Sequence, residues 1–483
     1  MSRVSGAVLA QSVAAAADPS ARRARPGMED AVLAAALAAM MVLPLAEVLL
    51  RRLLNTGISN QTSLVQHLTL VVGMIGGAIA AREGRLLALG TVEAHLKGTW
   101  LTVARVASGA FAATVAIMLC FASTRFVVSE RAAGGVLAYG IPLWVVQLAL
   151  PVGFGAIAAQ ILWRWFGEWP ARGATMGLTA VLTLLVSVVP VTPQDLVVPA
   201  FAVLLAATAL GAPLFAALGG AGLILFWGQG SPIASLTVDH YGLVTNPILP
   251  TVPLFTLAGY FLAEGGASRR LIRVFQALVG GIRGGPAILV ALVCAFFTSF
   301  TGASGVTILA LGGLLMPVLL SARYSEKTAL GLLTGTGSLG LLFPPCLPLI
   351  FYAVIANVEI THMFLGGILP GVLLVGMTAA WGISQAPRDA VAEGRFEWRE
   401  TRAALWEAKW ELLIPVVAFG GLFSGLATPV EAAALTAFYA FVVETFFYRD
   451  FRRPRDVARV MTEAGVLIGG VLLILGVALG FTN

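Results

Sequence analysis

Hydrophobic residues in this chain are gathered into long blocks, which short polar or glycine-rich segments interrupt. Val32–Leu50, Leu101–Ala122 and Met363–Ser384 are three of these blocks. Each approaches the roughly 20 residues that an α-helix needs to cross a hydrocarbon core of about 30 Å. About a dozen such blocks follow one another along the chain. The pattern therefore predicts an all-α polytopic membrane protein.

The composition supports this class and excludes others. Of 483 residues, 58% are hydrophobic and 11% are charged, whereas soluble domains are about 45–50% apolar and about 25% charged. The net charge of +6 comes from Lys and Arg residues that flank the apolar blocks, so it does not indicate binding to nucleic acid. The histidines and cysteines show no metal-ligand or redox spacing, so we expect no bound cofactor: His67, His95, His240, His362, Cys120, Cys294 and Cys346.

The first part of the chain predicts a tail and a small four-helix membrane module. Residues 1–28 are rich in Ala, Ser and Arg and lack the apolar core of a signal peptide. We interpret them as a disordered cytoplasmic tail, with translation from Met28 as an alternative. Residues 29–170 form the small module, with its spans expected at Asp30–Leu50, Ser63–Ala81, Leu101–Thr124 and Tyr139–Trp163.

The distribution of basic residues predicts the orientation of this module. Lys and Arg are more numerous in the tail and in the even-numbered loops than in the opposite loops. By the positive-inside rule, the N-terminus and the Arg82–Lys97 loop are cytoplasmic, and the Arg125–Gly135 segment is periplasmic. Residues 171–194 form a linking span and loop, because the apolar run Met176–Val189 precedes the Pro-rich stretch Pro190–Pro193.

Residues 195–483 form a large transport module in which Gly, Pro and hydroxyl residues cut the apolar blocks. In Pro286–Leu320, two apolar arms of about fifteen residues flank the sequence Thr301-Gly302-Ala303-Ser304-Gly305. Fifteen helical residues cover only about 22 Å. The pattern predicts a re-entrant hairpin whose tip lies at membrane depth, where free backbone groups are tolerated only inside protein or beside a polar cavity. This makes the Thr301 and Ser304 hydroxyls candidates for an ion or substrate site, with hydrogen bonding to their own backbone as the alternative.

Two further breaks follow in the large module. The Gly-rich helix Ala329–Leu342 meets Phe343-Pro344-Pro345-Cys346 before a new apolar run begins at Leu347. Paired prolines free carbonyls one turn earlier, and such carbonyls suit a hard cation such as sodium. Thr428-Pro429-Val430-Glu431 predicts a helix start with Thr428 as the cap and Glu431 in the first turn, where either dipole electrostatics or a coupling role explains the acid. The alternating charges between Arg388 and Lys409 predict an amphipathic interfacial helix.

An ordered series of motifs in this module resembles the large membrane subunit of the tripartite ATP-independent periplasmic (TRAP) transporters. The small module resembles that family's four-helix membrane subunit, fused in front, through the segment Gly77–Arg85. The resemblance covers nearly everything from about residue 30 onward. The motifs of the large module are Pro253–Gly259, Gly281–Gly285, Phe297–Gly312, Gly340–Pro348, Gly366–Gly371 and Ala427–Ala432.

The resemblance implies a sodium symporter of the bacterial inner membrane, with an elevator-type transport module. A periplasmic solute-binding protein would deliver an organic acid such as a dicarboxylate, and membrane lipid would surround the chain. The sodium ligands would fall on Thr301, Ser304 and the carbonyls of Gly340, Phe343 and Pro345. The substrate contacts would fall on Thr301, Gly302, Ser304, Thr307 and Cys346. The family usually has serines where this chain has Ala303 and Cys346.

One departure from the family and two rival functions remain at this stage. The family's second, inverted hairpin and second Pro-Pro break are not present after Gly465–Gly480. We therefore expect the large module to hold the first inverted repeat and the start of the second, with a separate chain supplying the second hairpin. A non-transporting fragment or scaffold is one alternative. A polytopic membrane enzyme is the other, although the loops carry no catalytic constellation, and we expect no enzyme.

Overall fold

The computed structural model of this chain describes residues 27–90, 92, 95–164, 169–188, 193–387, 397–425 and 427–482. Most of the expected tail and most of the Pro-rich boundary at 190–193 lie outside these residues. The described chain divides into two compact units. Unit 1 contains residues 254–461 and the described residues before Val32, and unit 2 contains residues 32–253 and 462–482. Each unit is described by itself below.

The helices have the length and composition of membrane spans. In the described part of the chain, eight helices are long and apolar enough to cross a bilayer, and one bent pair of helices adds a possible ninth. The prediction of an all-α polytopic membrane protein is therefore confirmed. The described strands, β1 (Val136–Ala138) and β2 (Ile141–Pro142), form one small antiparallel hairpin. Its two-residue turn, Tyr139-Gly140, has positive φ at both positions, as a tight β-hairpin turn requires.

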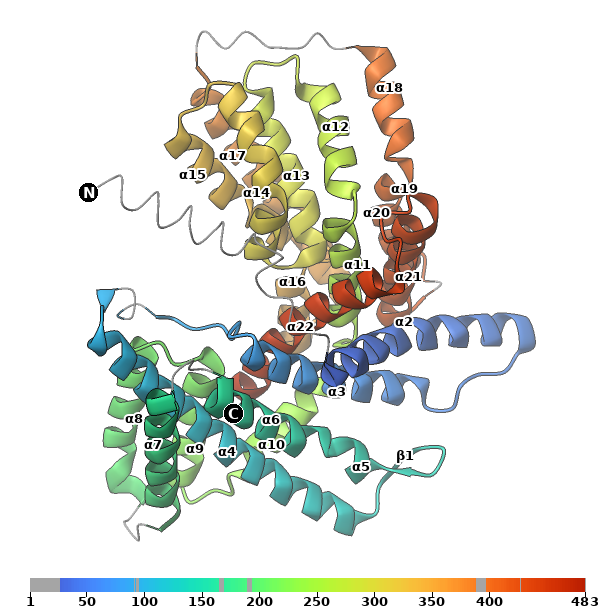
Figure 1. Cartoon of the computed structure of the whole chain (residues 1–483). Coiled ribbons are helices and arrows are strands. Elements are labelled where there is room, and N and C mark those ends of the chain that lie inside the picture. The colour runs from blue at the N-terminus through green and yellow to red at the C-terminus, as the bar shows by residue number, and fades with distance from the viewer. Residues whose placement is uncertain are drawn as a thin grey trace. The chain divides into compact units, whose positions relative to one another are not determined.

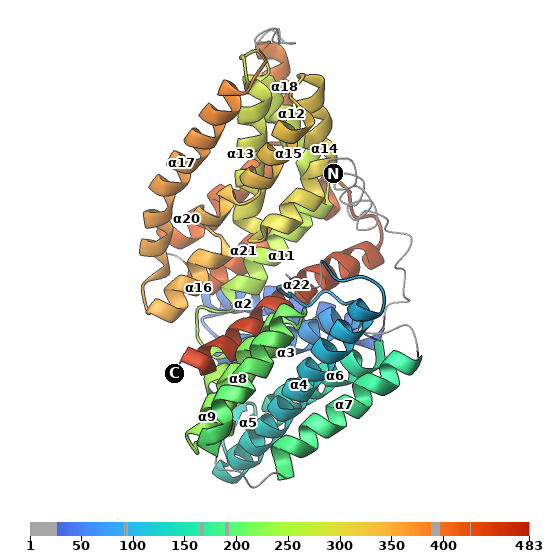
Figure 2. The ribbon, with the colours of Figure 1, turned by 90° about the vertical axis from the view of Figure 1, so that its left-hand side faces the viewer.

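Unit 2 contains the four predicted spans of the small module. These are α2 (Met28–Leu54), α3 (Gln61–Arg82), α4 (Thr99–Ala133) and the pair α5 (Leu143–Gln147) and α6 (Ala149–Arg164). Three extend beyond their expected bounds, whereas the fourth begins at Leu143 instead of Tyr139, because the chain before it forms the β-hairpin. The helix α4 continues through Arg125 and Arg131, which the sequence placed in a loop, because no Gly or Pro stops it before Gly134. Figure 2 shows α4 beside α6 and α7 (Trp169–Val188). The described part of the predicted linking span, residues 176–188, is helical.

Three further helices of the sequence and the end of the last one also belong to unit 2. The helices α8 (Pro193–Ala209), α9 (Leu214–Gly228) and α10 (Ala234–Val244) pack against α4. The last helix, α22 (Pro454–Thr482), lies against α3 at a seam of glycines: a Cβ on Gly469 would lie 2.3 Å from the backbone carbon of Gly76. Such a close approach of two backbones is possible only where neither residue has a side chain. The module boundary expected at 194–195 stays a prediction. Residues 195–253 belong to the same compact unit as the four-helix part of the chain.

Unit 1 is built around α13 (Gly285–Thr301). Figure 1 shows α12 (Ala267–Val279), α14 (Ser304–Ser321) and α17 (Ile360–Ser384) beside it. The helix α11 (Thr251–Glu264) precedes these. Its Gly259 is in close contact with the end of α13: a Cβ on Gly259 would lie 2.7 Å from the Thr301 nitrogen. The remaining elements are α15 (Glu326–Thr336), the 3₁₀ helix η2 (Leu339–Leu342), α16 (Leu347–Ala356), α18 (Trp398–Glu407), α19 (Lys409–Leu412), α20 (Ile414–Phe423), α21 (Pro429–Val442) and the π-helix η3 (Val443–Phe447).

The first two predicted helix breaks are confirmed, with two differences in where their flanking helices end. The hairpin break is only two residues long, Gly302-Ala303, so its arms have 17 and 18 residues instead of about fifteen. The Pro-Pro break separates η2 from α16, and the axis bends by 40° across it. The helix before it ends at Thr336, earlier than the predicted Leu342, because the chain tightens into a separate 3₁₀ turn after Gly337-Ser338.

The third predicted helix start is a capping box. The Glu431 N–H donates to Thr428 Oγ1 at 3.3 Å, and the Thr428 N–H donates to Glu431 Oε2 at 2.7 Å. Pro429 occupies the first helical position, where its missing N–H costs nothing. The carboxylate of Glu431 therefore has a structural task at this helix start. Residues 388–396 of the predicted amphipathic helix lie outside the described residues, and the rest of that prediction corresponds to α18.

Candidate functional site

The predicted hairpin tip is formed by the end of α13 and the start of α14. Gly302 has φ +65° and its N–H donates to the Thr298 carbonyl at 2.8 Å, which closes α13 in a left-handed turn. Ala303 is extended and Ser304 begins α14. A left-handed φ favours glycine, and a Cβ at Gly302 would also lie 2.1 Å from Leu347 Cγ. Thus the backbone conformation of the tip and the contact with Leu347 both require glycine at position 302.

A chain of hydroxyl groups connects the two arms of the hairpin. Thr307 Oγ1 lies 2.8 Å from Thr298 Oγ1 and 3.0 Å from Thr301 Oγ1. Thr298 Oγ1 donates to the Gly337 carbonyl oxygen at 2.9 Å. All three threonines are buried. Because each hydroxyl offers two acceptor lone pairs, this chain can present oxygen atoms to a cation while its own hydrogen bonds persist.

The Pro-Pro break lies directly against the hairpin. A Cβ on Gly340 would be 2.4 Å from the Ala295 carbonyl oxygen and 2.5 Å from the Ser299 nitrogen. Gly302 of the hairpin tip also lies against Leu347, at the start of α16. The structure therefore brings the two broken elements together, as the paired breaks in the sequence indicated.

The carbonyl groups expected as ligands are partly engaged within the break itself. The Gly340 carbonyl accepts from the Phe343 N–H and the Phe343 carbonyl accepts from the Cys346 N–H, both at 3.1 Å. Each carbonyl oxygen has a second lone pair for another partner. Pro344 and Pro345 are buried, and their peptide bond is cis.

The remaining expected residues differ in their surroundings. Ser304 is half-buried at the first position of α14, where the free N–H groups of a helix start also favour an anion. Cys346 is fully buried and its thiol donates to the Leu341 carbonyl at 2.6 Å. The hydrogen of the Cys346 thiol is therefore used inside the break.

Two members of this site were missed by the sequence analysis. Thr298 continues the hydroxyl chain from Thr307 to the Gly337 carbonyl, where the chain ends, but neither residue stands in the break sequences. Thr298 lies one helical turn before Thr301, so the i, i+3 spacing of two threonines was the available signal. Nothing local marks Gly337 as an acceptor for a residue 39 positions away.

The fold and this site define a multi-pass α-helical membrane protein with a helical hairpin and a broken helix in contact. Comparison with known families then identifies it further. The family of the tripartite ATP-independent periplasmic transporter, DctM component, matches residues 201–482, and the DctQ component matches residues 40–171. The chain belongs to the TRAP transporter family, with small and large membrane components in one chain.

Individual relatives support the same assignment. The isethionate TRAP transporter permease protein DctMQ of Oleidesulfovibrio alaskensis is 30% identical over 353 residues, which are 71% of this chain and 55% of the relative. The C4-dicarboxylate large permease protein DctM of Vibrio cholerae is 34% identical over 251 residues, or 50% and 54% of the two chains. The ectoine/5-hydroxyectoine large permease protein UehC of Ruegeria pomeroyi is 30% identical over 262 residues, or 54% and 61%.

These matches confirm the family predicted from the motifs. The relatives are named as permease proteins, which supports a transporter component over an enzyme. The aligned part of the chain spans a little more than half the length of each of these relatives.

Proposed function

We propose that the chain is the membrane permease of a sodium-coupled importer in the bacterial inner membrane. Its substrate is a small organic acid that a periplasmic solute-binding protein delivers. The observation that carries this proposal is the contact between the hairpin tip and the Pro-Pro break, where threonine hydroxyls and backbone carbonyls gather. Relatives named for isethionate, C4-dicarboxylates and ectoine support a small organic acid as the substrate class.

The chemistry of the site suits sodium better than a transition metal. The described residues contain no group of three or more His, Cys, Asp or Glu side chains that could hold a metal ion. The tip instead offers the oxygens of Thr301 and Ser304 and the carbonyls of Gly340, Phe343 and Pro345, and such neutral oxygen ligands suit a hard cation. The start of α14 adds N–H groups that favour the acid group of a substrate. We propose Gly302, Thr307 and Cys346 as further substrate contacts.

Sodium-dependent thermal stability in detergent tests this proposal. A ligand that binds only the native state stabilises it by about 2.7 kcal/mol at a concentration 100-fold above Kd, so sodium should raise the Tm of the chain. Potassium at the same ionic strength is the control ion. We expect Ser304→Ala to weaken the sodium response and Gly340→Leu to abolish it, since the larger side chain would push the break off the hairpin.

The variant Ser321→Ala is the matched control, because it removes a hydroxyl at the other end of α14. Its sodium response should equal that of the wild type. If sodium shifts the Tm of the wild type, Ser304→Ala and Gly340→Leu by the same amount, the site assignment is wrong.

A further inference from the structure

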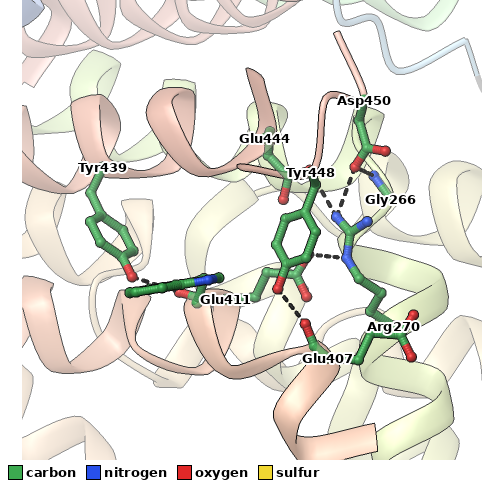
Figure 3. A network of polar contacts seen from close by, with 9 residues as sticks. Gly266, Arg270, Glu407, Glu411, Tyr439, Glu444, Tyr448 and Asp450 are labelled. Atoms are coloured by element: carbon green, nitrogen blue, oxygen red, sulfur yellow. Dashed lines mark hydrogen bonds and ion pairs between the residues drawn. The ribbon is translucent and has the colours of Figure 1, made fainter. Parts of the chain in front are cut away.

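Three acidic side chains and one arginine form a second polar centre in unit 1 (Figure 3). The side chains come from α12, α19, η3 and the residues after η3. Arg270 Nε lies 2.5 Å from Glu411 Oε1. Arg270 Nη2 lies 3.0 Å from Glu444 Oε2 and 2.8 Å from Asp450 Oδ2. The side chains of Glu411 and Glu444 are 0% exposed, whereas that of Asp450 is 27% exposed. We call these four residues the Arg270 cluster.

Two neighbouring basic side chains, Arg273 and Lys409, contact other partners. Arg273, one turn along α12, pairs with Glu400 and Glu407 on α18. The Lys409 ammonium lies over the rings of Trp406 and Trp410.

The Tyr448 ring covers the Arg270 guanidinium at 3.7 Å, and the Tyr448 hydroxyl donates to the Glu407 carbonyl. Figure 3 shows the Tyr448 ring beside Arg270 and the hydrogen bond from the Tyr448 hydroxyl to Glu407. Because all three carboxyl groups of the cluster contact Arg270, they share its single positive charge.

If all three acids were ionised, the cluster would hold three negative charges against one positive charge. Burial makes such an excess unfavourable, because a charge removed from water needs a partner. Two oxygens of the cluster, Glu411 Oε2 and Glu444 Oε1, are also buried without a hydrogen-bond partner among the described residues. Glu444 Oε2 and Asp450 Oδ2 both lie against the same nitrogen of Arg270, Nη2, so these two carboxyl groups are close neighbours. Two carboxyl groups can hydrogen-bond to each other only when one of them carries a proton.

We propose that the Arg270 cluster is a proton-binding site, with the proton on Glu444, and that this proton fastens α12 to the segments around it. Glu444 is the best place for the proton because its contact with Arg270 is the longest of the three. Asp450 has a second donor, the Gly266 N–H at 2.8 Å, and reaches solvent, so it stays ionised. The protonated Glu444 donates to Asp450, which removes one buried negative charge from the cluster.

The pKa shifts of the neighbouring acids agree with this arrangement. Burial opposes the ionised form of Asp450, but hydrogen bonds from Glu444, Arg270 and the Gly266 N–H hold the pKa of that carboxyl below its usual range. Burial raises the pKa of Glu411 to about 7, although Arg270 lies beside it. The raised pKa of Glu411 adds a second pH-sensitive carboxyl group to the cluster.

The position of the site gives this proton a consequence for the hairpin. The helix α12 leads into α13, the first arm of the hairpin, after a turn of residues 280–284. The Arg270 cluster and the Arg273 pairs hold α12 to α18, α19 and η3. Loss of the proton adds a buried negative charge at this junction and weakens the attachment of α12.

The pH dependence of thermal stability in detergent tests the proposal. The folded chain binds more protons here than the unfolded chain, so stability falls as pH rises. For Glu411 this fall covers the window from its ordinary pKa of 4.5 to about 7. The variant E444Q mimics the protonated side chain. We expect its Tm at alkaline pH to equal or exceed that of the wild type, with a pH slope smaller by one proton. The exposed control E400Q should keep the slope of the wild type.

Infrared spectroscopy gives a second readout that folding alone does not change. The carbonyl stretch of a protonated carboxylic acid should be present in the wild type at mildly alkaline pH and shift in D₂O. It should be absent in E444Q and retained in E400Q. If E444Q does not fold, E444D should keep the signal at a different frequency. A signal that is identical in the wild type, E444D and E444Q, or an E444Q variant that loses Tm equally at every pH, would overturn the proposal.

Discussion

At the scale of single residues, Thr307 has the central position in the candidate site. Its hydroxyl contacts both Thr298 and Thr301, and Thr298 continues to the Gly337 carbonyl. One side chain therefore connects both arms of the hairpin to the helix that precedes the Pro-Pro break. Removing this hydroxyl leaves two buried hydroxyls with fewer partners, which costs more than the hydrogen bonds themselves contribute.

We predict that Thr307→Val, which keeps the shape of the side chain, lowers the free energy of unfolding by about 1–3 kcal/mol. The exposed Thr334, whose hydroxyl donates to the Leu330 carbonyl of its own helix, provides the control. Thr334→Val should change stability by no more than about 0.5 kcal/mol. Denaturation in detergent compares the two variants. Equal effects at both positions would show that the hydroxyl chain contributes nothing special.

At the scale of helices, the sequence predicted the breaks well because their causes are local. Gly302 closes α13 by its backbone conformation, Pro344 and Pro345 stop a helix by lacking N–H groups, and Thr428 caps α21. The contacts between elements could not be predicted in this way. Glu411 and Glu444 belong to different segments, and each is an ordinary charge until folding places Arg270 between them.

The early end of α15 has the same explanation. The Gly-rich sequence before Phe343 predicted one continuous helix to Leu342, but the helix stops at Thr336. There Gly337 packs against Ile308 of the hairpin and its carbonyl accepts from Thr298. A partner from another element thus decided where the helix ends, and a single sequence does not reveal that partner.

The contact between the hairpin and the Pro-Pro break leads to a prediction with glycine variants. Gly340→Ala should destabilise the chain by more than about 1 kcal/mol, since its Cβ would lie 2.4 Å from the Ala295 carbonyl oxygen. Gly335→Ala, on the neighbouring helix, meets nothing within 4 Å and should be neutral or slightly stabilising. Thermal unfolding of both variants tests this. A Gly340→Ala variant as stable as the wild type would mean that the two elements are not packed this closely.

The glycine seam of unit 2 allows a comparison of two adjacent residues. At Gly469 a Cβ would be 2.3 Å from the Gly76 backbone, whereas at Gly470 it would meet nothing within 4 Å. We predict that Gly469→Ala separates α3 from α22 and lowers the Tm, while Gly470→Ala stabilises α22 by up to about 1 kcal/mol through helix propensity. Melting curves of the two variants decide between this seam and a loose contact, for which both variants would gain stability.

At the scale of the whole molecule, the orientation in the membrane is still a prediction from the basic residues. A cysteine placed at Arg85 should react with an impermeant thiol reagent from the cytoplasmic side, and one placed at Gly135 from the periplasmic side. Cys120 is half-exposed and should first be replaced, whereas Cys294 and Cys346 are buried. If the cysteine at position 85 were labelled from outside intact spheroplasts, the orientation would be the reverse of the predicted one.

The two arginines of α12 differ in how far they lie from water, and this difference affects how the chain responds to dissolved salt. Arg273 and its partner Glu400 are each 47% exposed, whereas the Arg270 side chain is only 12% exposed. At an ionic strength of 0.15 M the Debye length is about 8 Å, so mobile ions weaken exposed pairs and leave enclosed pairs nearly intact. Any salt, whatever its cation, should therefore weaken the exposed ion pairs of Arg273 that hold α12 to α18. A response specific to sodium appears only against a choline or potassium solution of equal ionic strength.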